Sequence, residues 1–206
     1  MLTAHQALDR LRKGNRRFVA GTRSLDTRTG PTRRTDIAGG QEPFAVILGC
    51  SDSRVPVELV FDQGLGDLFV IRVAGNIVAP SLLGSVEFAT ARFGTRLVVV
   101  LGHTRCGAVA ATLEELRQPT ERRSKNLSAI VDRVRPSIEA LLATDLSEDP
   151  VRLAREAVRA NVRASANQVR NGSAILEQLI GEEGLLVVGA EYDLDTGAVD
   201  FFEGAP

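Results

Sequence analysis

Four short runs of hydrophobic residues recur along the chain, and none of them alternates regularly with polar positions. A strand that is covered on both faces shows this unbroken pattern, as in a parallel sheet with helices on either side. Segments with helical spacing of apolar residues separate the runs. The alternation of strand and helix predicts an α/β domain with a mostly parallel central sheet. The expected strands span residues 44–49, 68–73, 97–101 and 185–189.

Capping residues and prolines place the expected helices. Thr3 and Gln6 match a capping box, which predicts an N-terminal helix from about Thr3 to Ala20. Ser81 is the expected cap of a helix that runs to Phe93 and stops at Gly94. Residues 198–202, after a turn at 195–197, are expected to form an antiparallel C-terminal edge strand. Further helices are expected from about Cys106 to Arg117, over 124–143 with an interruption at Pro136, and over 150–170.

A length of 206 residues favours one domain over two small ones. Within this single domain, 1–206, we expect an N-terminal helix and arm over 1–40, with 21–40 as an exposed connection, and an α/β core over 41–206. No apolar run approaches the 18 residues of a membrane helix, so no membrane partner is expected. The first residues lack the apolar stretch of a secretory signal. Two cysteines can form at most one disulfide bond, which is too few to stabilise a disulfide-rich secreted protein of this size. We therefore expect a cytoplasmic protein.

Charge is uneven along the chain although the net charge is only −1. Nine basic residues and one acid lie between Arg10 and Arg34, whereas residues 181–206 contain seven acids and no base. The basic arm lacks the interleaved aromatic residues that stack on bases, so no nucleic-acid partner is expected. The arm is either a solvated surface or a segment that reaches an acidic surface, which another subunit can provide.

Three soft metal ligands follow two of the predicted strands. Cys50 comes directly after the run 44–49, and His103 and Cys106 come after the run 97–101. In open α/β sheets, sites form beyond the carboxyl ends of the strands, so the three converge if the two strands are neighbours. Two thiolates and an imidazole suit Zn²⁺, although two buried structural cysteines are the alternative.

The loop that begins at Cys50 carries Asp52 and Arg54. In an extended loop, side chains two positions apart lie on the same side, so these two can pair above the metal; a surface ion pair of little consequence is the alternative. Only His5 could add another nitrogen or sulfur ligand, from far along the chain. Three protein ligands and one open position, the pattern of a catalytic zinc site, are therefore expected.

The segments 50–55, 64–76, 84–89 and 102–108 together resemble the β-class carbonic anhydrases, and most closely the plant-like subgroup with its bacterial members. The resemblance spans about residues 3–190. It implies an α/β fold with one Zn²⁺ per chain on Cys50, His103 and Cys106. It also implies that Asp52 and Arg54 form the catalytic dyad. The expected reaction is the reversible hydration of CO₂ to bicarbonate and a proton, by attack of zinc-bound hydroxide that the dyad orients.

The resemblance further implies the substrate-binding residues Gln41, Phe69, Phe88 and Gly107. Phe88 stands where the plant-like subgroup has tyrosine, and Ile47 stands where a second subgroup has a tryptophan linked to an inhibitory bicarbonate site. The expected assembly is a homodimer or homotetramer in which the N-terminal arm packs on the neighbouring subunit. Two rival interpretations remain from the residues: hydrolysis of carbonyl sulfide or carbon disulfide on the same scaffold, and a non-catalytic zinc-binding oligomer.

Overall fold

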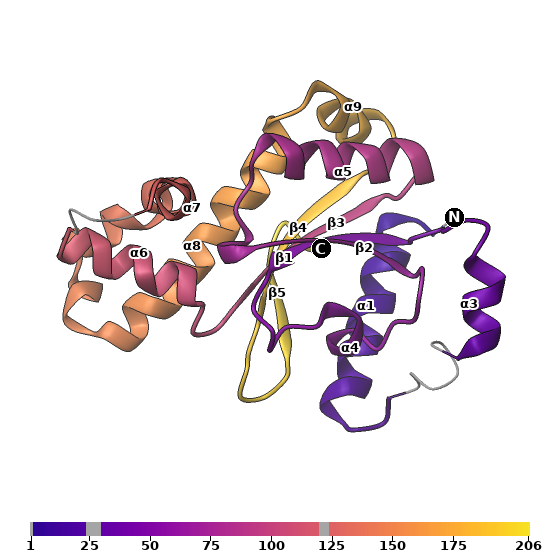
Figure 1. The fold of residues 1–206 in the computed structure, drawn as a ribbon, viewed down its shortest axis with the longest axis horizontal. Coiled ribbons are helices and arrows are strands. Elements are labelled where there is room, and N and C mark those ends of the chain that lie inside the picture. Colours follow the sequence, from indigo (N-terminus) through magenta and orange to yellow (C-terminus); the bar gives the residue numbers. More distant parts are fainter. Residues whose placement is uncertain (1, 24–29, 120–123) are drawn as a thin grey trace.

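Five strands form one mixed sheet in the computed structural model, which describes residues 2–23, 30–119 and 124–206 (Figure 1). The strand order is β2-β1-β3-β4-β5; β4 and β5 pair antiparallel and the other neighbours pair parallel. The predicted α/β fold with an antiparallel C-terminal edge is confirmed. The strands are β1 (Ala45–Cys50), β2 (Leu68–Val73), β3 (Leu97–His103), β4 (Leu186–Tyr192) and β5 (Val199–Glu203).

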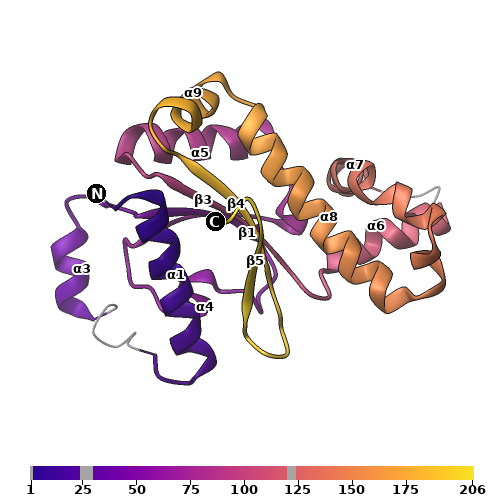
Figure 2. The ribbon, with the colours of Figure 1, turned by 180° about the vertical axis from the view of Figure 1, so that it is seen from behind.

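Helices cover both faces of the sheet, and a further group extends beyond the carboxyl ends of the strands (Figures 1 and 2). One face packs against α1 (Ala4–Val19) and α4 (Val57–Val60), and the other against α5 (Pro80–Phe93), α8 (Pro150–Asn171) and α9 (Ala174–Glu182). The N-terminal part of α8 packs with α6 (Gly107–Arg117) and α7 (Lys125–Ile138) around a third cluster that includes both cysteines. Short helical turns complete the chain: α3 (Pro31–Ile37), η1 (Ala74–Asn76), η2 (Glu139–Ala143) and η3 (Asp145–Glu148).

The helix ends follow local chemistry, with two differences from the expected boundaries. Helix α5 begins at Pro80, one residue before the expected cap Ser81, because a proline's fixed φ and missing N–H suit the first helical position. Pro136 lies inside α7, which ends two residues later and continues as η2. The stretch expected as an exposed connection contains the short exposed helix α3, while residues 24–29 lie outside the described part of the chain.

The N-terminal helix packs on the chain's own core. The predicted capping box is confirmed, with Thr3 and Gln6 bonded reciprocally, and Leu8 and Leu11 are buried. Arg17 Nε lies 2.5 Å from a carboxylate oxygen of the buried Asp62, and Arg10 pairs with Asp67 at 3.0 Å. Four arginines of the basic arm, Arg10, Arg12, Arg17 and Arg33, therefore meet acids of the same chain, whereas Arg28 lies outside the described residues. Among the described helices, none combines the length and the apolar character that a membrane span requires.

Candidate metal centre

The three predicted ligands converge at the carboxyl end of the sheet. Their ligand atoms, the sulfurs of Cys50 and Cys106 and a ring nitrogen of His103, all lie within 4.8 Å of one another, and all three residues are buried. Strands β1 and β3 are adjacent and paired from Val46↔Val98 to Gly49↔Leu101, which brings Cys50 beside the end of β3. The predicted convergence is confirmed, and it forms a site for one zinc ion per chain.

Each ligand lies where an element ends. Cys50 is the last residue of β1, and His103 is the last residue of β3. Arg105 adopts a positive φ of 56°, which turns the chain so that Cys106 becomes the N-cap of α6. The N–H groups of Val109 and Ala108 favour the thiolate form of Cys106, as expected for a sulfur at a helix N-terminus.

His103 is oriented as a metal ligand. Its Nδ1 lies 3.0 Å from the carbonyl oxygen of Thr104, so this nitrogen carries the proton and donates it. Its Nε2 is buried and has no hydrogen-bond partner among the described residues. A buried lone pair without a donor is costly unless something binds it. The imidazole therefore fits a metal ion placed between it and the two sulfurs, because a second interaction at Nδ1 is what normally fixes a ligating histidine.

The two thiols influence each other strongly. A hydrogen bond from the Cys106 thiol lowers the pKa of Cys50 against the effect of burial, and the N–H of Gly75, 3.4 Å from the sulfur, lowers it further. The same hydrogen bond, together with burial, raises the pKa of Cys106. The pair therefore loses one proton readily and holds the other. A divalent cation is the natural group to displace that second proton, since thiolate is the form that binds zinc.

Asp52 and Arg54 form a two-point ion pair beside the cluster. Arg54 Nε donates to Asp52 Oδ1 at 2.9 Å, and Arg54 Nη2 donates to Oδ2 at 2.7 Å. These hydrogen bonds hold the pKa of Asp52 well below its usual range, so the carboxylate is ionised. Asp52 Oδ2 lies 3.8 Å from His103 Nε2, which places the acid next to the nitrogen that faces the metal position. The predicted pairing is confirmed in geometry.

His5 is exposed in the first turn of α1 and is not a member of the cluster. The metal site therefore has the three expected ligands, and a tetrahedral zinc bound by three side chains keeps a fourth position for a water molecule or substrate. Gly107 is the first residue of α6, directly after Cys106, so its backbone N–H belongs to the free donors of that helix start.

The other three expected substrate-binding residues lie away from the metal cluster of their own chain. Phe69 pairs in register with Val46, four positions before Cys50, which corresponds to about 13 Å along the strand. Phe88 on α5 packs near Phe69, with ring centroids 6.2 Å apart. Gln41 is exposed, just before the amino end of β1. A single chain brings Gly107 to the metal cluster but does not bring Gln41, Phe69 and Phe88 there.

Two groups that support Cys50 were not predicted from the sequence. Gly75 has a positive φ of 73° that turns its N–H toward the Cys50 sulfur. Its carbonyl accepts a hydrogen bond of 2.7 Å from Asn161, which is buried on α8. A polar side chain on the apolar face of a long helix was the available signal for Asn161, but the sequence does not show what that side chain contacts.

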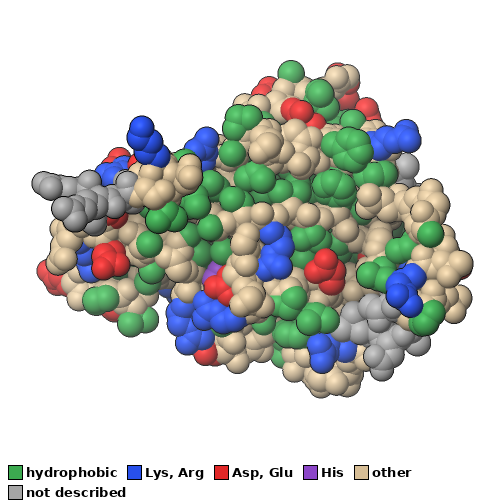
Figure 3. Space-filling model, viewed as in Figure 1, with side chains coloured by type: hydrophobic (Ala, Val, Ile, Leu, Met, Phe, Trp, Pro, Cys, Tyr) green, Lys and Arg blue, Asp and Glu red, His purple; other side chains and the backbone are tan. Residues whose placement is uncertain are grey.

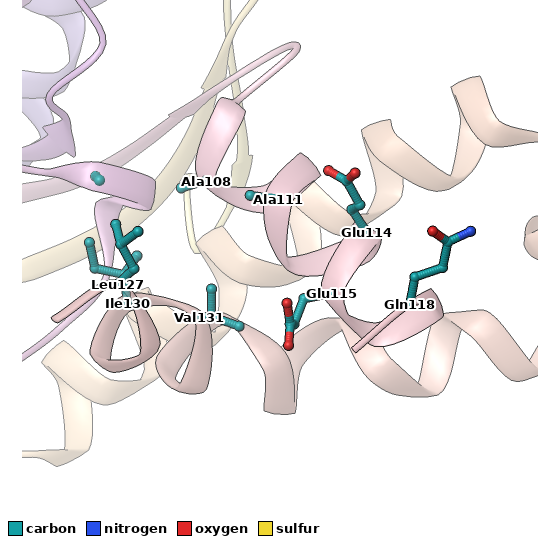
Figure 4. A pocket seen from close by; sticks show the side chains of 9 residues that line it. Ala108, Ala111, Glu114, Glu115, Gln118, Leu127, Ile130 and Val131 are labelled. Carbon is teal, nitrogen blue, oxygen red and sulfur yellow. The ribbon is translucent and has the colours of Figure 1, made fainter. Parts of the chain in front are cut away.

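A groove of about 460 Å³ lies beside the cluster, between α6 and α7. Figure 4 shows Ala108 and Ala111 on one wall and Leu127, Ile130 and Val131 on the other. Ala74 completes the inner end, next to the Gly75 that contacts Cys50. The groove is therefore mainly apolar where it borders the metal site, while two glutamates and a glutamine lie along its outer part.

Comparisons with known proteins agree with this geometry. A protein-family model described as carbonic anhydrase matches residues 45–199. Carbonic anhydrase 2 of Mycobacterium tuberculosis is 41% identical over 197 residues, covering 91% of this chain and 87% of that protein. A carbonic anhydrase of Mycolicibacterium smegmatis is 40% identical over 190 residues, covering 92% and 89%. A structure reported among two tetrameric β-carbonic anhydrases of Sordaria macrospora superposes with a TM-score of 0.75 at 28% identity, covering 84% of this chain and 87% of that one.

Proposed function

The chain belongs to the β-class carbonic anhydrases, enzymes of CO₂ hydration, and on that premise we propose that Asp52 and Arg54 act as the catalytic dyad beside a zinc ion on Cys50, His103 and Cys106. The observation that carries this proposal is the two-point pairing of Asp52 with Arg54 beside the buried Nε2 of His103, which has no hydrogen-bond partner in the described part of the chain. Zinc bound there supplies a nucleophile by lowering the pKa of a water molecule toward neutrality.

Asp52 orients that nucleophile. An ionised carboxylate can only accept a hydrogen bond, so Asp52 fixes the O–H of the attacking group toward itself. The remaining lone pairs of the nucleophile are then directed at the carbon of CO₂. Arg54 keeps Asp52 ionised and holds both of its oxygens, which prevents the carboxylate from rotating freely.

Gly107 contributes a backbone N–H that can donate a hydrogen bond to the substrate. As the first residue of α6, it presents an N–H that the helix does not use, at the positive end of the helix dipole. This donor is suited to an oxygen of CO₂ as negative charge develops on it, and to bicarbonate.

Replacing Arg54 tests the dyad. We expect Arg54→Met to lower kcat/KM for CO₂ hydration by about 10- to 100-fold. Loss of a residue that orients a group beside a metal through hydrogen bonds typically lowers activity by about this factor. Arg54→Lys should recover only part of the activity, since an ammonium group cannot bond both carboxylate oxygens as a planar fork does. Stopped-flow hydration assays on protein of measured zinc content provide the measurement. Activity of Arg54→Met within twofold of the parent would contradict the proposed role.

We further assign the chain to the plant-like subgroup and to the cytoplasm. Gln41 matches the glutamine of that subgroup, and Ile47 replaces the tryptophan of the other. Both cysteines of the chain are free thiols in the metal cluster, which suits a reducing compartment.

We propose that Gln41, Phe69 and Phe88 serve the metal site of a second copy in a homodimer or a larger assembly. Phe88 is 53% exposed and belongs to an aromatic cluster with Phe69 and Phe93. Figure 3 shows hydrophobic side chains gathered in a band across this face, below α5, and β2 is an edge of the sheet. The expected contact of the N-terminal arm with the neighbouring subunit stays part of this proposal; within its own chain, α1 packs on the core.

A charge on this face tests the assembly. Phe88→Glu is expected to shift the protein toward smaller species in analytical ultracentrifugation and to reduce hydration activity per zinc, because burying an unpaired carboxylate is costly. Ile175→Glu is the matched control, since Ile175 is 48% exposed on α9, outside the aromatic cluster. A Phe88→Glu protein with unchanged size and activity would overturn the proposal.

A further inference from the structure

Arg72, which has no part in the dyad, reaches from one strand to the loop that carries the metal ligand and the acid. It is exposed near the end of the edge strand β2. Its Nε donates to the carbonyl oxygen of Cys50 at 2.9 Å, and its Nη2 donates to the carbonyl oxygen of Asp52 at 2.6 Å. One guanidinium therefore holds two backbone carbonyls of the catalytic loop.

These two carbonyls lie where the sheet stops supporting the loop. Cys50 is the last residue of β1 in register with β2, and the N–H of Ser51 still donates to the Val73 carbonyl at 3.2 Å. Beyond Ser51 the chain forms a turn in which the N–H of Val55 donates to the Asp52 carbonyl at 3.0 Å. Arg72 bonds on both sides of this change, so it connects the end of the strand ladder to the turn that presents Asp52.

We propose that Arg72 is a positioning residue that sets the distance and orientation of the Asp52 carboxylate relative to the Cys50 sulfur; this inference rests on the proposed dyad. Arg72 is itself fixed on a paired strand, and its guanidinium presents donors in a rigid plane. The fixed backbone keeps Asp52 Oδ2 at 3.8 Å from His103 Nε2. Positioning of this kind has large kinetic value, because a displacement of about 1 Å can cost 100-fold in rate.

A purely stabilising role and a purely electrostatic role make different predictions. The Arg72 side chain is exposed, so water can solvate the two carbonyls when it is removed, and little stability should be lost. An electrostatic role needs only the positive charge, which lysine keeps. A positioning role needs both hydrogen bonds, which lysine cannot make in the same plane.

Arg72→Met and Arg72→Lys test the proposal, with Arg96→Met as the matched control. Arg96 Nη1 also donates to two backbone carbonyls, those of Thr90 at 3.1 Å and Thr95 at 3.4 Å, but at the amino end of the sheet. In zinc-loaded Arg72→Met we expect kcat to fall by about 10- to 100-fold with KM within about twofold. Arg72→Lys should recover less than half of that loss, and Arg96→Met should keep its kcat.

The absorption spectrum of the cobalt-substituted proteins gives a readout that does not depend on turnover, since it reports ligand geometry. We expect the spectrum to change in Arg72→Met and to stay unchanged in Arg96→Met. Parental kcat and spectrum in Arg72→Met, full recovery by Arg72→Lys, or an equal kcat loss in Arg96→Met would each overturn the proposal. The proposed dyad is tested separately. It would be wrong if a variant without the Asp52 carboxylate kept its hydration activity, whatever the result for Arg72.

Discussion

Asp52→Asn is expected to lower kcat/KM for CO₂ hydration by about 100- to 1000-fold while zinc content stays at one per chain. The substitution keeps the size of the side chain but replaces an obligate acceptor with an amide that also donates. The amide no longer selects one orientation of the nucleophile's O–H, and it cannot form the charged two-point pair with Arg54. Stopped-flow hydration and elemental analysis of the same preparation measure the two quantities.

Asp195→Asn is the matched control for that experiment. Asp195 pairs with Arg105 at 2.6 Å, so it is also half of an ion pair on the loops around the metal site, but both side chains are exposed. Its replacement should leave activity within about twofold, because exposed ion pairs contribute little. The double variant Asp52→Asn/Arg54→Met should lose little more than Asp52→Asn alone, since residues that act as a unit are non-additive. Additive losses, or an Asp52→Asn enzyme with more than half of the parental rate, would remove the dyad from the mechanism.

Cys50→Ser is expected to abolish stoichiometric zinc binding and, with it, hydration activity. Serine is nearly the same size, but its hydroxyl does not ionise near neutral pH and is a poor zinc ligand. Removal of a residue that only hydrogen-bonds a metal ligand lowers metal affinity by about 10- to 100-fold, and loss of the ligand itself should lower zinc affinity by more than that. Competition with a chromophoric chelator measures the affinity, and added Zn²⁺ should not restore the rate.

Thermal unfolding provides an independent measure of the same site. Zinc at about 100 times its dissociation constant stabilises the folded state by about 2.7 kcal/mol. At about 2–4 °C per kcal/mol for a chain of this size, chelation should lower the Tm of the parent protein by about 5–10 °C. The Tm of Cys50→Ser should not respond to chelator, whereas Asp52→Asn should respond as the parent does. A chelator response in Cys50→Ser would place the zinc elsewhere.

Much of the sheet could be predicted because its strands are buried on both faces, and each therefore reads as an unbroken apolar run. β2 was predicted with its observed bounds. β3 and β4 extend two to three residues past their apolar runs, through His103 and Tyr192, because ladder pairing continues where the side chains become polar. The short helices α3 and α4 lacked a hydrophobic period long enough to be recognised.

Some features of the site depend on nearby residues in the sequence and could be predicted, whereas others depend on how distant elements pack together. The ligands could be predicted because strand ends place them. The Asp52–Arg54 pair was predicted from its i,i+2 spacing in an extended loop, whereas the structure forms the pair within a turn closed by the Val55 N–H and the Asp52 carbonyl. The contacts of Arg72 and Asn161 could not, since they depend on which strand lies beside β1 and on how α8 crosses the sheet. The separation of Phe69 and Gln41 from the cluster follows from their places at or before the amino ends of their strands, which the expected strand bounds already imply, because the metal ligands lie at the carboxyl ends.

The adjacency of β1 and β3 has a consequence for how the protein retains its ion. Cys50 and His103 terminate two strands whose pairing lies in the middle of the sheet, flanked by β2 and β4. Motion of the surrounding loops does not separate these two residues while the hydrogen bonds between β1 and β3 stay intact. Loss of the site by local unfolding therefore requires opening of the central ladder, whereas zinc release from the folded protein proceeds through stepwise replacement of its ligands.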